Sequence, residues 1–418
     1  MWAIVLPDDT ESGPRSSAGA SAGASAASAA CRVHKRSVSA SASAKAAARA
    51  KPKAKAKASP SKPTFDHKPW LPGPLPTGPI GYASDCSGLD AGAFALGRIT
   101  AFRHHFASEV DPTYKMILTA THPNINTVFD DMTVRDPQQL DVFMDRVTIY
   151  TAGFPCPIYS NQGNRQGMDD PSGAGLVIFY VALAIGKLIP DLFILENVPD
   201  FATNKKFKQH FDVAMRTLNE CAGGIYNIHW RILNSRDFGV PALRQRLYIV
   251  GIRRDRQRAE WTWPVASQKV SLTSILDQDS PTDAQRLAFL CGLAPYRLRN
   301  LVAGLEKIKN THPYADMEKE PWVIDIGKVK SYATSVYRDE LPTITKTRAK
   351  ELHWFITNRG GLIREHELLR CQGFDPSTII VPPRVNRSRL REMAGNAVTV
   401  NVMEALFWCS LRALGRDR

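Results

Sequence analysis

Residues 80–255 alternate between short, strongly apolar runs and amphipathic stretches of helical length. Four runs rich in β-branched and aromatic residues have the length of strands: IGYASD (80–85), VTIYTA (147–152), DLFILEN (191–197) and RLYIVGI (246–252). Strands that alternate with helices are typical of βαβ units, so the pattern predicts an α/β fold with a mostly parallel sheet. In such sheets, ligands collect at the carboxyl ends of the strands.

The longest apolar run, GLVIFYVALAIG at 175–186, is too short to span a bilayer and is followed by Lys187, so it predicts a buried helix. After residue 255, prolines, scattered charges and short apolar runs replace the alternation until about residue 385, which indicates a second, smaller unit. AGNAVTVNVMEALFWCSLRAL, 394–414, has apolar residues at helical spacing. It predicts a helix that follows a turn at Gly395 and Asn396 and returns the chain to the first domain.

Residues 1–77 are dominated by Ala, Ser and Lys, and this composition predicts a disordered tail because it cannot bury enough apolar surface. Residues 1–68 hold 12 Lys and Arg against 4 Asp and Glu, and the chain has a formal net charge of +14. A phosphate backbone is the simplest partner for such a tail. A solubilising linker or a nuclear import signal fits as well, whereas Asp8, Asp9 and Glu11 argue against an organelle transit peptide.

The seven cysteines form no CxxC pair and are odd in number. This argues against a disulfide framework and against a zinc site, and it fits a reducing compartment. Cys156 lies between Pro155 and Pro157, whose fixed φ and missing N–H groups end the preceding strand in a stiff loop. A thiol held there is either packed inward as a small side chain or displayed as a nucleophile.

Six motifs share one order and similar gaps with a known family: GFPCPIYS (153–160), ENVPDF (196–201), NSRDFGVPALRQRLYIVG (234–251), LPTITK (341–346), ELLRCQGF (367–374) and AGNAV (394–398). Together they resemble the cytosine-5 DNA methyltransferases over nearly all of residues 80–415. The resemblance implies a Rossmann-like S-adenosylmethionine-dependent methyltransferase domain at 78–255 and 386–418. It also implies a target-recognition domain at 256–385, preceded by the disordered basic tail at 1–77.

The resemblance implies that Cys156 is a nucleophile that adds to carbon 6 of cytosine as a thiolate, which requires a partly exposed, electropositive loop. Glu196 matches the glutamate of the family's ENV motif, which contacts the ring nitrogen and the exocyclic amine and has to be partly protonated. Asn197 would orient the loop. Arg246 and, less closely, Arg244 match the arginine pair that holds the cytosine carbonyl oxygen and the neighbouring loop. Taken alone, these residues would be a turn-capping acid and a solvated surface pair.

The resemblance also implies S-adenosyl-L-methionine as the methyl donor, bound beside the first strand. Gly88 matches the glycine of the following turn, where a cofactor approaches the backbone closely. Glu109 ends the second strand, where an acid can accept both ribose hydroxyls, and Asp131 follows the third in position for the adenine amine. Asn396 would close the pocket. The full predicted cofactor set is Cys86, Ser87, Gly88, Leu89, Glu109, Val110, Asp131, Met132, Phe154, Pro155, Asn396, Ala397 and Val398.

The segment NQGNRQGMDDPSGAG, 161–175, resembles the mobile loop that closes over DNA after the target base has left the helix. Extrusion is required because carbon 6 is stacked inside a duplex. Arg165 would touch a phosphate or the orphaned base, and a plain surface loop is the alternative. Four positions depart from the family pattern: Pro157 and Ala242 each replace a Gln, Cys86 replaces the aromatic ring that stacks on adenine, and Ser172 replaces an Arg.

The sequence therefore predicts a DNA (cytosine-5-)-methyltransferase that extrudes its target base. Two alternatives stay open: an inactive relative that binds DNA or regulates, and a tRNA cytosine methyltransferase, whose Pro-Pro-Cys-Gln pattern is absent. We expect double-stranded DNA as the partner, no membrane, no metal, a monomeric state, and a nuclear or alternatively organellar location. Candidates for base contacts in the target-recognition domain are Trp261, Trp263, Arg297 and Arg299.

Overall fold

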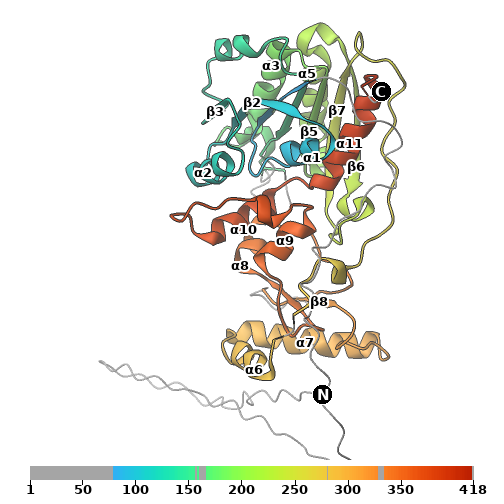
Figure 1. Cartoon of the computed structure of the whole chain (residues 1–418). Helices are drawn as coiled ribbons and strands as arrows, with labels where there is room; N and C mark the ends of the chain where they lie inside the picture. The colour runs from blue at the N-terminus through green and yellow to red at the C-terminus, as the bar shows by residue number, and fades with distance from the viewer. Residues whose placement is uncertain (1–78, 156–157, 160–165, 280, 328–333, 417–418) are drawn as a thin grey trace, which may run out of the picture.

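The computed structural model describes residues 79–155, 158–159, 166–279, 281–327 and 334–416, which form two domains joined at a narrower waist (Figure 1). The larger domain is built on a seven-stranded sheet with the order β3-β2-β1-β4-β5-β7-β6. Its strands are β1 (Ile80–Asp85), β2 (Phe102–Ser108), β3 (Thr127–Phe129), β4 (Ile149–Gly153), β5 (Leu192–Asn197), β6 (Tyr226–Asn234) and β7 (Gln245–Arg253). The first five in this order run parallel, whereas β7 is antiparallel to both of its neighbours. The prediction of an α/β fold with a mostly parallel sheet is confirmed.

Helices cover both faces of this sheet because its central strands are buried on both sides. The helices of the larger domain are α1 (Ala91–Ile99), α2 (Pro112–Thr121), α3 (Val177–Leu188), α4 (Asp200–Thr203), α5 (Lys208–Glu220), α10 (Arg387–Asn396) and α11 (Val400–Ala413). Among the described residues, no helix is long and apolar enough to cross a membrane. The run at 175–186 forms most of α3, whose apolar face is buried.

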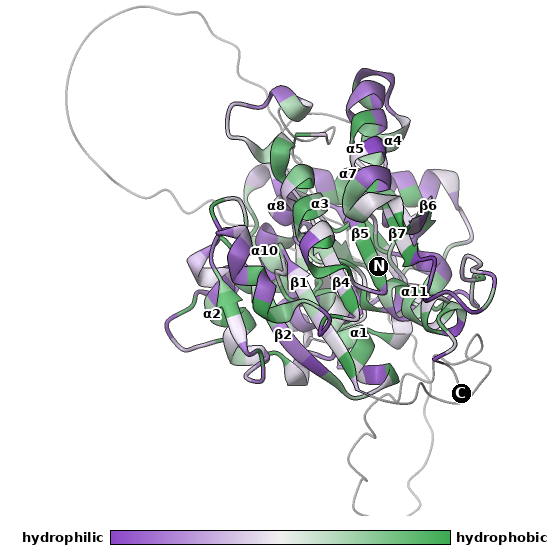
Figure 2. Cartoon of the chain, turned by 90° about the horizontal axis from the view of Figure 1, so that it is seen from above, coloured by the Kyte–Doolittle hydropathy of each residue, from purple (hydrophilic) through white to green (hydrophobic). Residues whose placement is uncertain are grey.

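Alternate residues of each central strand belong to two different cores. Tyr82 packs with α1 and α11 on one face, and the adjacent Ala83 packs with α3 and α5 on the other. Figure 2 shows the central strands coloured as hydrophobic between helices whose outer surfaces are more polar. The two cores clamp the sheet, so the carboxyl ends of β1 to β5 are held at one rigid edge.

The smaller domain contains an antiparallel sheet with the order β11-β10-β8-β9. Its elements are β8 (Trp322–Asp325), β9 (Val336–Arg338), β10 (Trp354–Ile356), β11 (Gly361–Leu362), α6 (Asp283–Cys291), α7 (Pro295–Thr311), α8 (Lys346–Glu351) and α9 (Glu365–Cys371). Helix α7 packs on β8 at the end farthest from the large sheet, and α8 packs on α10 between the domains (Figure 1). Short 3-10 helices span Pro137–Phe143, Gly167–Asp169, Ala174–Leu176, Lys205–Phe207, Cys221–Gly224, Ser235–Phe238, Leu272–Ser274 and Pro376–Thr378.

Two expectations about local structure are wrong. The turn expected at Gly395 and Asn396 is instead the last turn of α10. The helical conformation is interrupted at residues 397–399, and α11 begins after Thr399. Trp261, a candidate for base contacts, is not exposed: it is buried against His229, and its indole N–H donates to Ser410 Oγ of α11 at 3.1 Å. The chain around Trp261 therefore packs onto the larger domain.

Candidate active site

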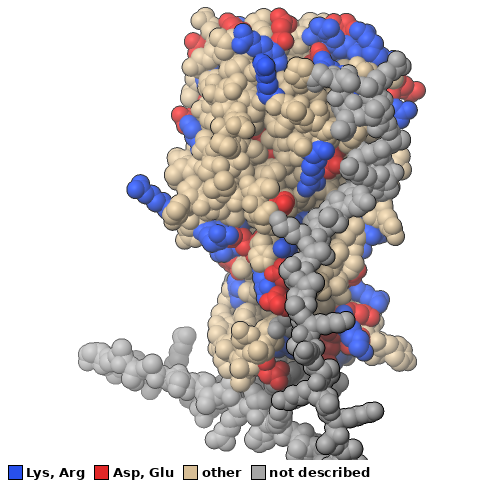
Figure 3. Space-filling view, viewed as in Figure 1, with Lys and Arg blue, Asp and Glu red and all other residues tan. Residues whose placement is uncertain are grey.

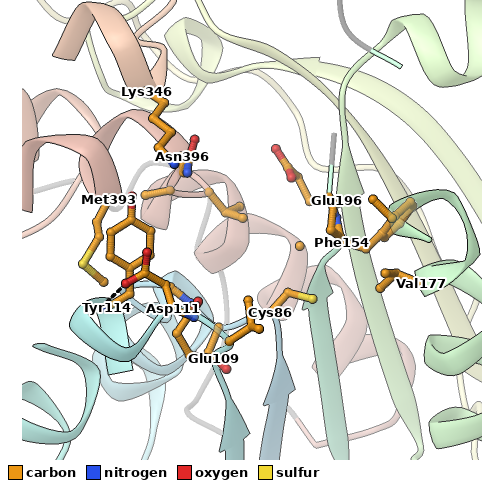
Figure 4. Close-up of a pocket in the computed structure, with 18 of the residues that line it drawn as sticks. Cys86, Glu109, Asp111, Tyr114, Phe154, Val177, Glu196, Lys346, Met393 and Asn396 are labelled. Atoms are coloured by element: carbon orange, nitrogen blue, oxygen red, sulfur yellow. Dashed lines mark hydrogen bonds between the residues drawn. The ribbon is translucent and has the colours of Figure 1, made fainter. Parts of the chain in front are cut away.

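Among the described residues, a cavity of about 1020 Å³ opens at the carboxyl ends of β1 to β5 and continues to residues 343–347 of the smaller domain. All residues of the predicted cofactor set line it, together with Glu196, Arg244 and Arg246 (Figure 4). The residues lie together because the carboxyl ends of parallel strands meet at one edge of the sheet. Their contacts with a bound cofactor stay predictions. Cys156, Pro157 and Arg165 lie outside the described residues.

The turn after β1 presents its backbone to the cavity. Gly88 has φ +56°, a conformation that favours glycine, and no other atom lies within 4 Å of the position that a Cβ would take there. Its N–H donates to Glu109 Oε2 at 3.0 Å, and the N–H of Asp111 donates to Oε1 of the same carboxylate at 3.0 Å. Glu109 is thereby held across the ends of β1 and β2, where it can still accept hydroxyl donors from the cavity.

The next wall follows β3. Asp131 Oδ1 accepts the backbone N–H and the hydroxyl of Thr133, both at 2.8 Å. Met132 is buried, and its Sδ lies 3.7 Å from Cys86 Sγ. Burial raises the pKa of Cys86 well above its usual range, and the carboxylates of Asp85, Glu109 and Asp131 add to this effect, so the thiol keeps its proton at neutral pH.

The buried side-chain amide of Asn197 fixes the backbone at Phe154, shortly before Cys156 in the sequence. Asn197, at the end of β5, donates from Nδ2 to the carbonyl oxygen of Phe154 at 3.2 Å, and its Oδ1 accepts the N–H of Val198 at 2.8 Å. Phe154 directly follows β4 and packs edge-on against Phe201. Asn197 therefore joins the ends of β4 and β5, and its role in orienting the loop stays a prediction.

Glu196 and Arg246 form a buried ion pair on neighbouring strands, with Arg246 Nε 3.0 Å from Glu196 Oε1. Burial raises the pKa of Glu196, while the positive charges of Arg246 and Arg244 oppose this effect. The upward direction prevails, so the carboxyl group is more readily protonated than an exposed glutamate. It can therefore donate a proton to a ring nitrogen that enters the cavity.

Arg244 has a different environment from the one expected for a base-contacting residue. Its side chain is buried, and the guanidinium donates to the carbonyl oxygens of Ile344, Gly395, Asn396 and Ala397 at 2.6, 3.2, 3.5 and 2.8 Å. Arg244 thus holds the smaller domain and the α10–α11 link against β7. Of the two arginines, Arg246 is the one paired with Glu196.

Three of the four departures from the family pattern, Cys86, Ala242 and Ser172, lie within the described residues. Ala242 is fully buried with Val240 and Leu341, and its carbonyl accepts from Arg244 N. Ser172 lines the cavity and caps a turn by bonding to Asp170 Oδ1. The loop end at Ser172 is therefore held locally, without a cationic side chain.

The sequence analysis missed a buried carboxylate beneath the cofactor turn. Asp90 has φ +57° and accepts hydrogen bonds from Tyr82 Oη at 2.6 Å, Ser84 Oγ at 2.7 Å and the N–H of Ala93 at 3.0 Å. His104 Nε2 lies 3.3 Å from its Oδ2. These contacts lower the pKa of Asp90 to about 2, against the opposing effect of burial. An acid inside the glycine-containing turn CSGLDAG was the available signal.

Other residues that line the cavity belong to segments for which the sequence predicted no specific role. Tyr114 and Asp111 follow Glu109 in the sequence, and Lys346 of the LPTITK motif lies near them, with its Nζ 5.9 Å from the centroid of the Tyr114 ring (Figure 4). Thr343 and Thr345 of the same motif also line the cavity. Tyr114 Oη donates to Glu392 Oε2 of α10 at 3.0 Å. The cavity wall is thus cross-linked between α2 and α10.

Asp277, His366 and Glu367 place metal-ligating groups close together in the smaller domain. Their acids already have cationic partners. Asp277 accepts from Arg364 at 2.6 Å and from Arg370 at 2.8 Å, while Glu367 pairs with Arg359. Three guanidinium groups on two carboxylates describe an ion-pair network that ties residues 277–279 to α9, rather than a cation site.

The sequence of this chain is similar to those of known proteins. A model of the C-5 cytosine-specific DNA methylase family matches residues 83–408. The type II methyltransferase M.NgoBI of Neisseria gonorrhoeae is 28% identical over 302 residues, covering 72% of this chain and 83% of the relative. The type II methyltransferase M.HhaI of Haemophilus parahaemolyticus is 31% identical over 263 residues, covering 61% and 73%.

Solved structures share the fold. The Entamoeba histolytica methyltransferase EhMeth superposes with a TM-score of 0.54 at 16% identity, covering 80% of this chain and 99% of that structure. A candidate DNA modification methyltransferase encoded within an E. coli prophage gives 0.56 at 16% identity with the same coverage. At this level of identity the likeness concerns the fold alone.

Proposed function

The chain belongs to the C-5 cytosine-specific DNA methylase family, and we propose that it methylates carbon 5 of an extruded cytosine in double-stranded DNA with S-adenosyl-L-methionine as the donor. One observation carries the proposal: the Glu196–Arg246 pair lies in the same cavity as the Gly88–Glu109 turn. A cytosine and a methyl donor can therefore meet in one enclosed space. Asn197 fixes the backbone carbonyl of Phe154, which precedes Cys156 in the sequence.

The residues on the donor side fit S-adenosyl-L-methionine. Glu109 offers a carboxylate already aligned by two backbone N–H groups, and Asp131 offers a second one at the end of the next strand. The open space at Gly88 allows close approach to the backbone. When bound, the donor supplies an electrophilic methyl group for carbon 5.

The proposed chemistry begins at Cys156. Its thiol loses a proton, the sulfur forms a bond to carbon 6, and the electron pair of the 5,6 double bond moves to carbon 5. Glu196 gives its proton to ring nitrogen 3 as negative charge builds there, and Arg246 binds the carbonyl oxygen at carbon 2. After methylation, the proton on carbon 5 leaves to water, the carbon–sulfur bond breaks and frees Cys156 as a thiolate, and ring nitrogen 3 returns its proton to Glu196.

Double-stranded DNA is the substrate that we propose on the basis of family and charge. The relatives M.NgoBI and M.HhaI are named as type II methyltransferases, and the family description specifies DNA. On the face shown in Figure 3, Lys and Arg side chains lie at the waist between the domains as well as on the larger domain, mixed with acidic ones. Extrusion of the base supplies access to carbon 6, since neither face of a stacked cytosine is reachable.

A mechanism-based trap tests the proposal. Incubation with duplex DNA that contains 5-fluorocytosine and with S-adenosyl-L-methionine should give a denaturant-resistant protein–DNA adduct, because fluorine at carbon 5 prevents the final elimination. Cys156→Ser should form none, and Cys291→Ser should trap as the wild type does. Adduct formation on 5-fluorocytosine tRNA but not on DNA would favour the tRNA alternative. Failure to trap either substrate would favour the inactive relative.

We propose a nuclear location and a monomeric protein, with an organellar location as the alternative. Support comes from the basic composition of residues 1–77, which suits both nuclear import and a phosphate backbone. A fluorescent fusion of the full chain should accumulate in nuclei, and a fusion of residues 78–418 should lose this accumulation. Light scattering of the purified chain should give the mass of one copy.

A further inference from the structure

A histidine on α5 contacts a segment that follows the proposed nucleophile in the sequence. His210 is not among the residues that line the cavity, and its side chain is 20% exposed. The backbone N–H of Met168 donates to His210 Nδ1 at 3.3 Å. Because Nδ1 accepts this hydrogen bond, the neutral imidazole carries its proton on Nε2, which lies 4.0 Å from Asp169 Oδ2.

The backbone at Gly167 is fitted to this imidazole ring. Gly167 is buried and has φ +65°, and a Cβ there would lie 2.4 Å from His210 Nδ1. A Cβ on Gly175 would likewise lie 2.4 Å from the Cα of Met168. Since glycine leaves this space free, the segment 167–169 lies directly against α5.

Gly167 is also bonded to the chain that follows Cys156. Its N–H donates to the carbonyl oxygen of Ile158 at 3.0 Å, and Ile158 comes two residues after Cys156 in the sequence. Ile158 and Tyr159 are both buried, and the centroid of the Tyr159 ring lies 6.4 Å from that of the His210 ring. One hydrogen bond therefore connects the segment that His210 contacts with Ile158.

The described residues on the two sides of Cys156 are held by different side chains. Asn197 binds the carbonyl oxygen of Phe154, which comes two residues before Cys156. On the other side, Ile158 is bonded to the segment that His210 contacts. Two anchors restrict a residue between them more than one does, because each removes conformational freedom from the chain.

We propose that His210 is a positioning residue for the methyl transfer, and that its Nδ1 holds the segment 167–169 so that Cys156 can reach carbon 6 of the cytosine. The proposal rests on the proposed function. A nucleophile that is already well placed reacts faster, since less freedom is lost on the way to the transition state. Without the acceptor at His210, the N–H of the half-buried Met168 loses its hydrogen bond, and attack by Cys156 should slow by about fivefold to thirtyfold.

Trapping on duplex DNA that contains 5-fluorocytosine, at saturating S-adenosyl-L-methionine, measures this rate. His210→Phe keeps a ring but has no acceptor, so adduct formation should slow by about fivefold to thirtyfold. His210→Asn places an amide oxygen close to the position of Nδ1, so its rate should return to within about threefold of the wild type. Gln209→Phe, at the exposed neighbouring position on α5, is the control and should trap as the wild type does.

Binding and stability separate positioning from a general loss of structure. Each variant should bind S-adenosyl-L-homocysteine with a Kd within about twofold of the wild type, because the proposed donor contacts are at Glu109 and Asp131. If His210→Phe unfolds at a lower temperature than the wild type, His210→Leu is compared with His210→Asn instead. The proposal is overturned if a folded variant without the acceptor traps at the wild-type rate, or if His210→Asn is as slow as that variant.

Hydrogen exchange gives a second readout, which needs no turnover. In the wild type, the amide of Met168 should exchange at least about tenfold more slowly than an unbonded amide, because it is bonded to His210 Nδ1. His210→Phe should remove this protection, and His210→Asn should keep it. A Met168 amide that exchanges equally fast in the wild type and in His210→Phe would also overturn the proposal.

The failure of this inference can be told apart from failure of the proposed function. If the wild type and His210→Phe trap DNA at the same rate, the proposed function stands and His210 has no part in it. If the wild type forms no adduct although its Met168 amide is protected, the proposed function fails, and the role of His210 in the reaction fails with it.

Discussion

Arg246 Nε lies 3.0 Å from Glu196 Oε1, and the two residues come from antiparallel neighbours, β7 and β5. The carboxylate is buried at the end of its strand, with the cavity on its open side. Burial raises its pKa and the arginine lowers it, so the pair adjusts how easily Glu196 carries a proton. A proton donor of this kind is what the proposed addition to cytosine needs.

Glu196→Gln should reduce turnover by about 10² to 10⁴, because a positioned acid contributes about this much and an amide cannot give up a proton. Binding of S-adenosyl-L-homocysteine should be unchanged, since the proposed donor contacts are at Glu109 and Asp131. Single-turnover methyl transfer and calorimetry measure the two effects. Glu220→Gln, at the exposed end of α5, is the control. A Glu196→Gln enzyme with wild-type turnover would remove Glu196 from the chemistry.

Arg246→Met should move the alkaline limb of the pH–rate profile to higher pH. The protonated fraction of Glu196 falls as pH rises through its pKa, and the arginine lowers that pKa. Removing the positive charge raises the pKa further, so the protonated form persists at higher pH. Initial rates between pH 6 and 10 test this, with the exposed Arg254 changed to Met as the comparison. A shift of the alkaline limb to lower pH would show that a group other than Glu196 causes this limb.

Asn197→Asp should slow formation of the 5-fluorocytosine adduct by about five- to a hundredfold, since loss of one buried hydrogen bond costs about 1 to 3 kcal/mol. A carboxylate cannot donate to the carbonyl oxygen of Phe154, so the loop that carries Cys156 loses its anchor. Donor affinity should change little. The matched change Asn219→Asp, on the exposed face of α5, should have no effect. An unchanged trapping rate would show that the loop is held by other contacts.

Arg244→Lys should lower the free energy of unfolding by about 3 kcal/mol, because a lysine keeps the charge but cannot reach four carbonyl oxygens. The contacts join β7 to both the LPTITK segment and the α10–α11 link, so donor binding at Asn396 should weaken as well. Urea denaturation and calorimetry measure these effects. If stability falls while donor binding is normal, Arg244 supports only the domain contact.

Asp90→Asn should destabilise the chain by about 2 kcal/mol at pH 7, because the pKa of Asp90 is lowered to about 2 in the folded state. A carboxylate with a depressed folded pKa stabilises the fold above its unfolded value, and this contribution is lost as pH falls through the folded value. The difference between wild type and variant should therefore shrink to about half at pH 3. Asp130→Asn, where the side chain is 83% exposed, is the control. A difference that does not depend on pH would point to packing instead of charge.

Strands β1, β4, β5 and β7 were predictable because they are buried on both faces and read as continuous apolar runs. Gly88, Glu109 and Asp131 of the predicted cofactor set line one cavity for a related reason, since each follows a parallel strand. Local sequence is sufficient for such positions because the fold class itself brings strand ends together.

The positions that were missed depend on partners far along the chain. Arg244 precedes β7, which begins at Gln245, and turns toward carbonyl groups that the sequence places at least 100 residues later. Trp261 lies in a proline-containing, charged stretch, yet its partner Ser410 belongs to α11. No local pattern encodes these two contacts. Asp90 differs, because its partners Tyr82 and Ser84 lie on β1 within eight residues of it, and the acid inside CSGLDAG was a local signal.

Methyl transfer itself is the most direct test of the proposed function. Purified full-length protein is incubated with duplex DNA and methyl-labelled S-adenosyl-L-methionine, beside Cys156→Ser and the Cys291→Ser control, and label in 5-methylcytosine is measured after digestion to nucleosides. We expect label with the wild type and the control and none with Cys156→Ser. A wild type that binds the donor but leaves duplex DNA unlabelled, or a Cys156→Ser protein that labels it normally, would contradict the proposed reaction.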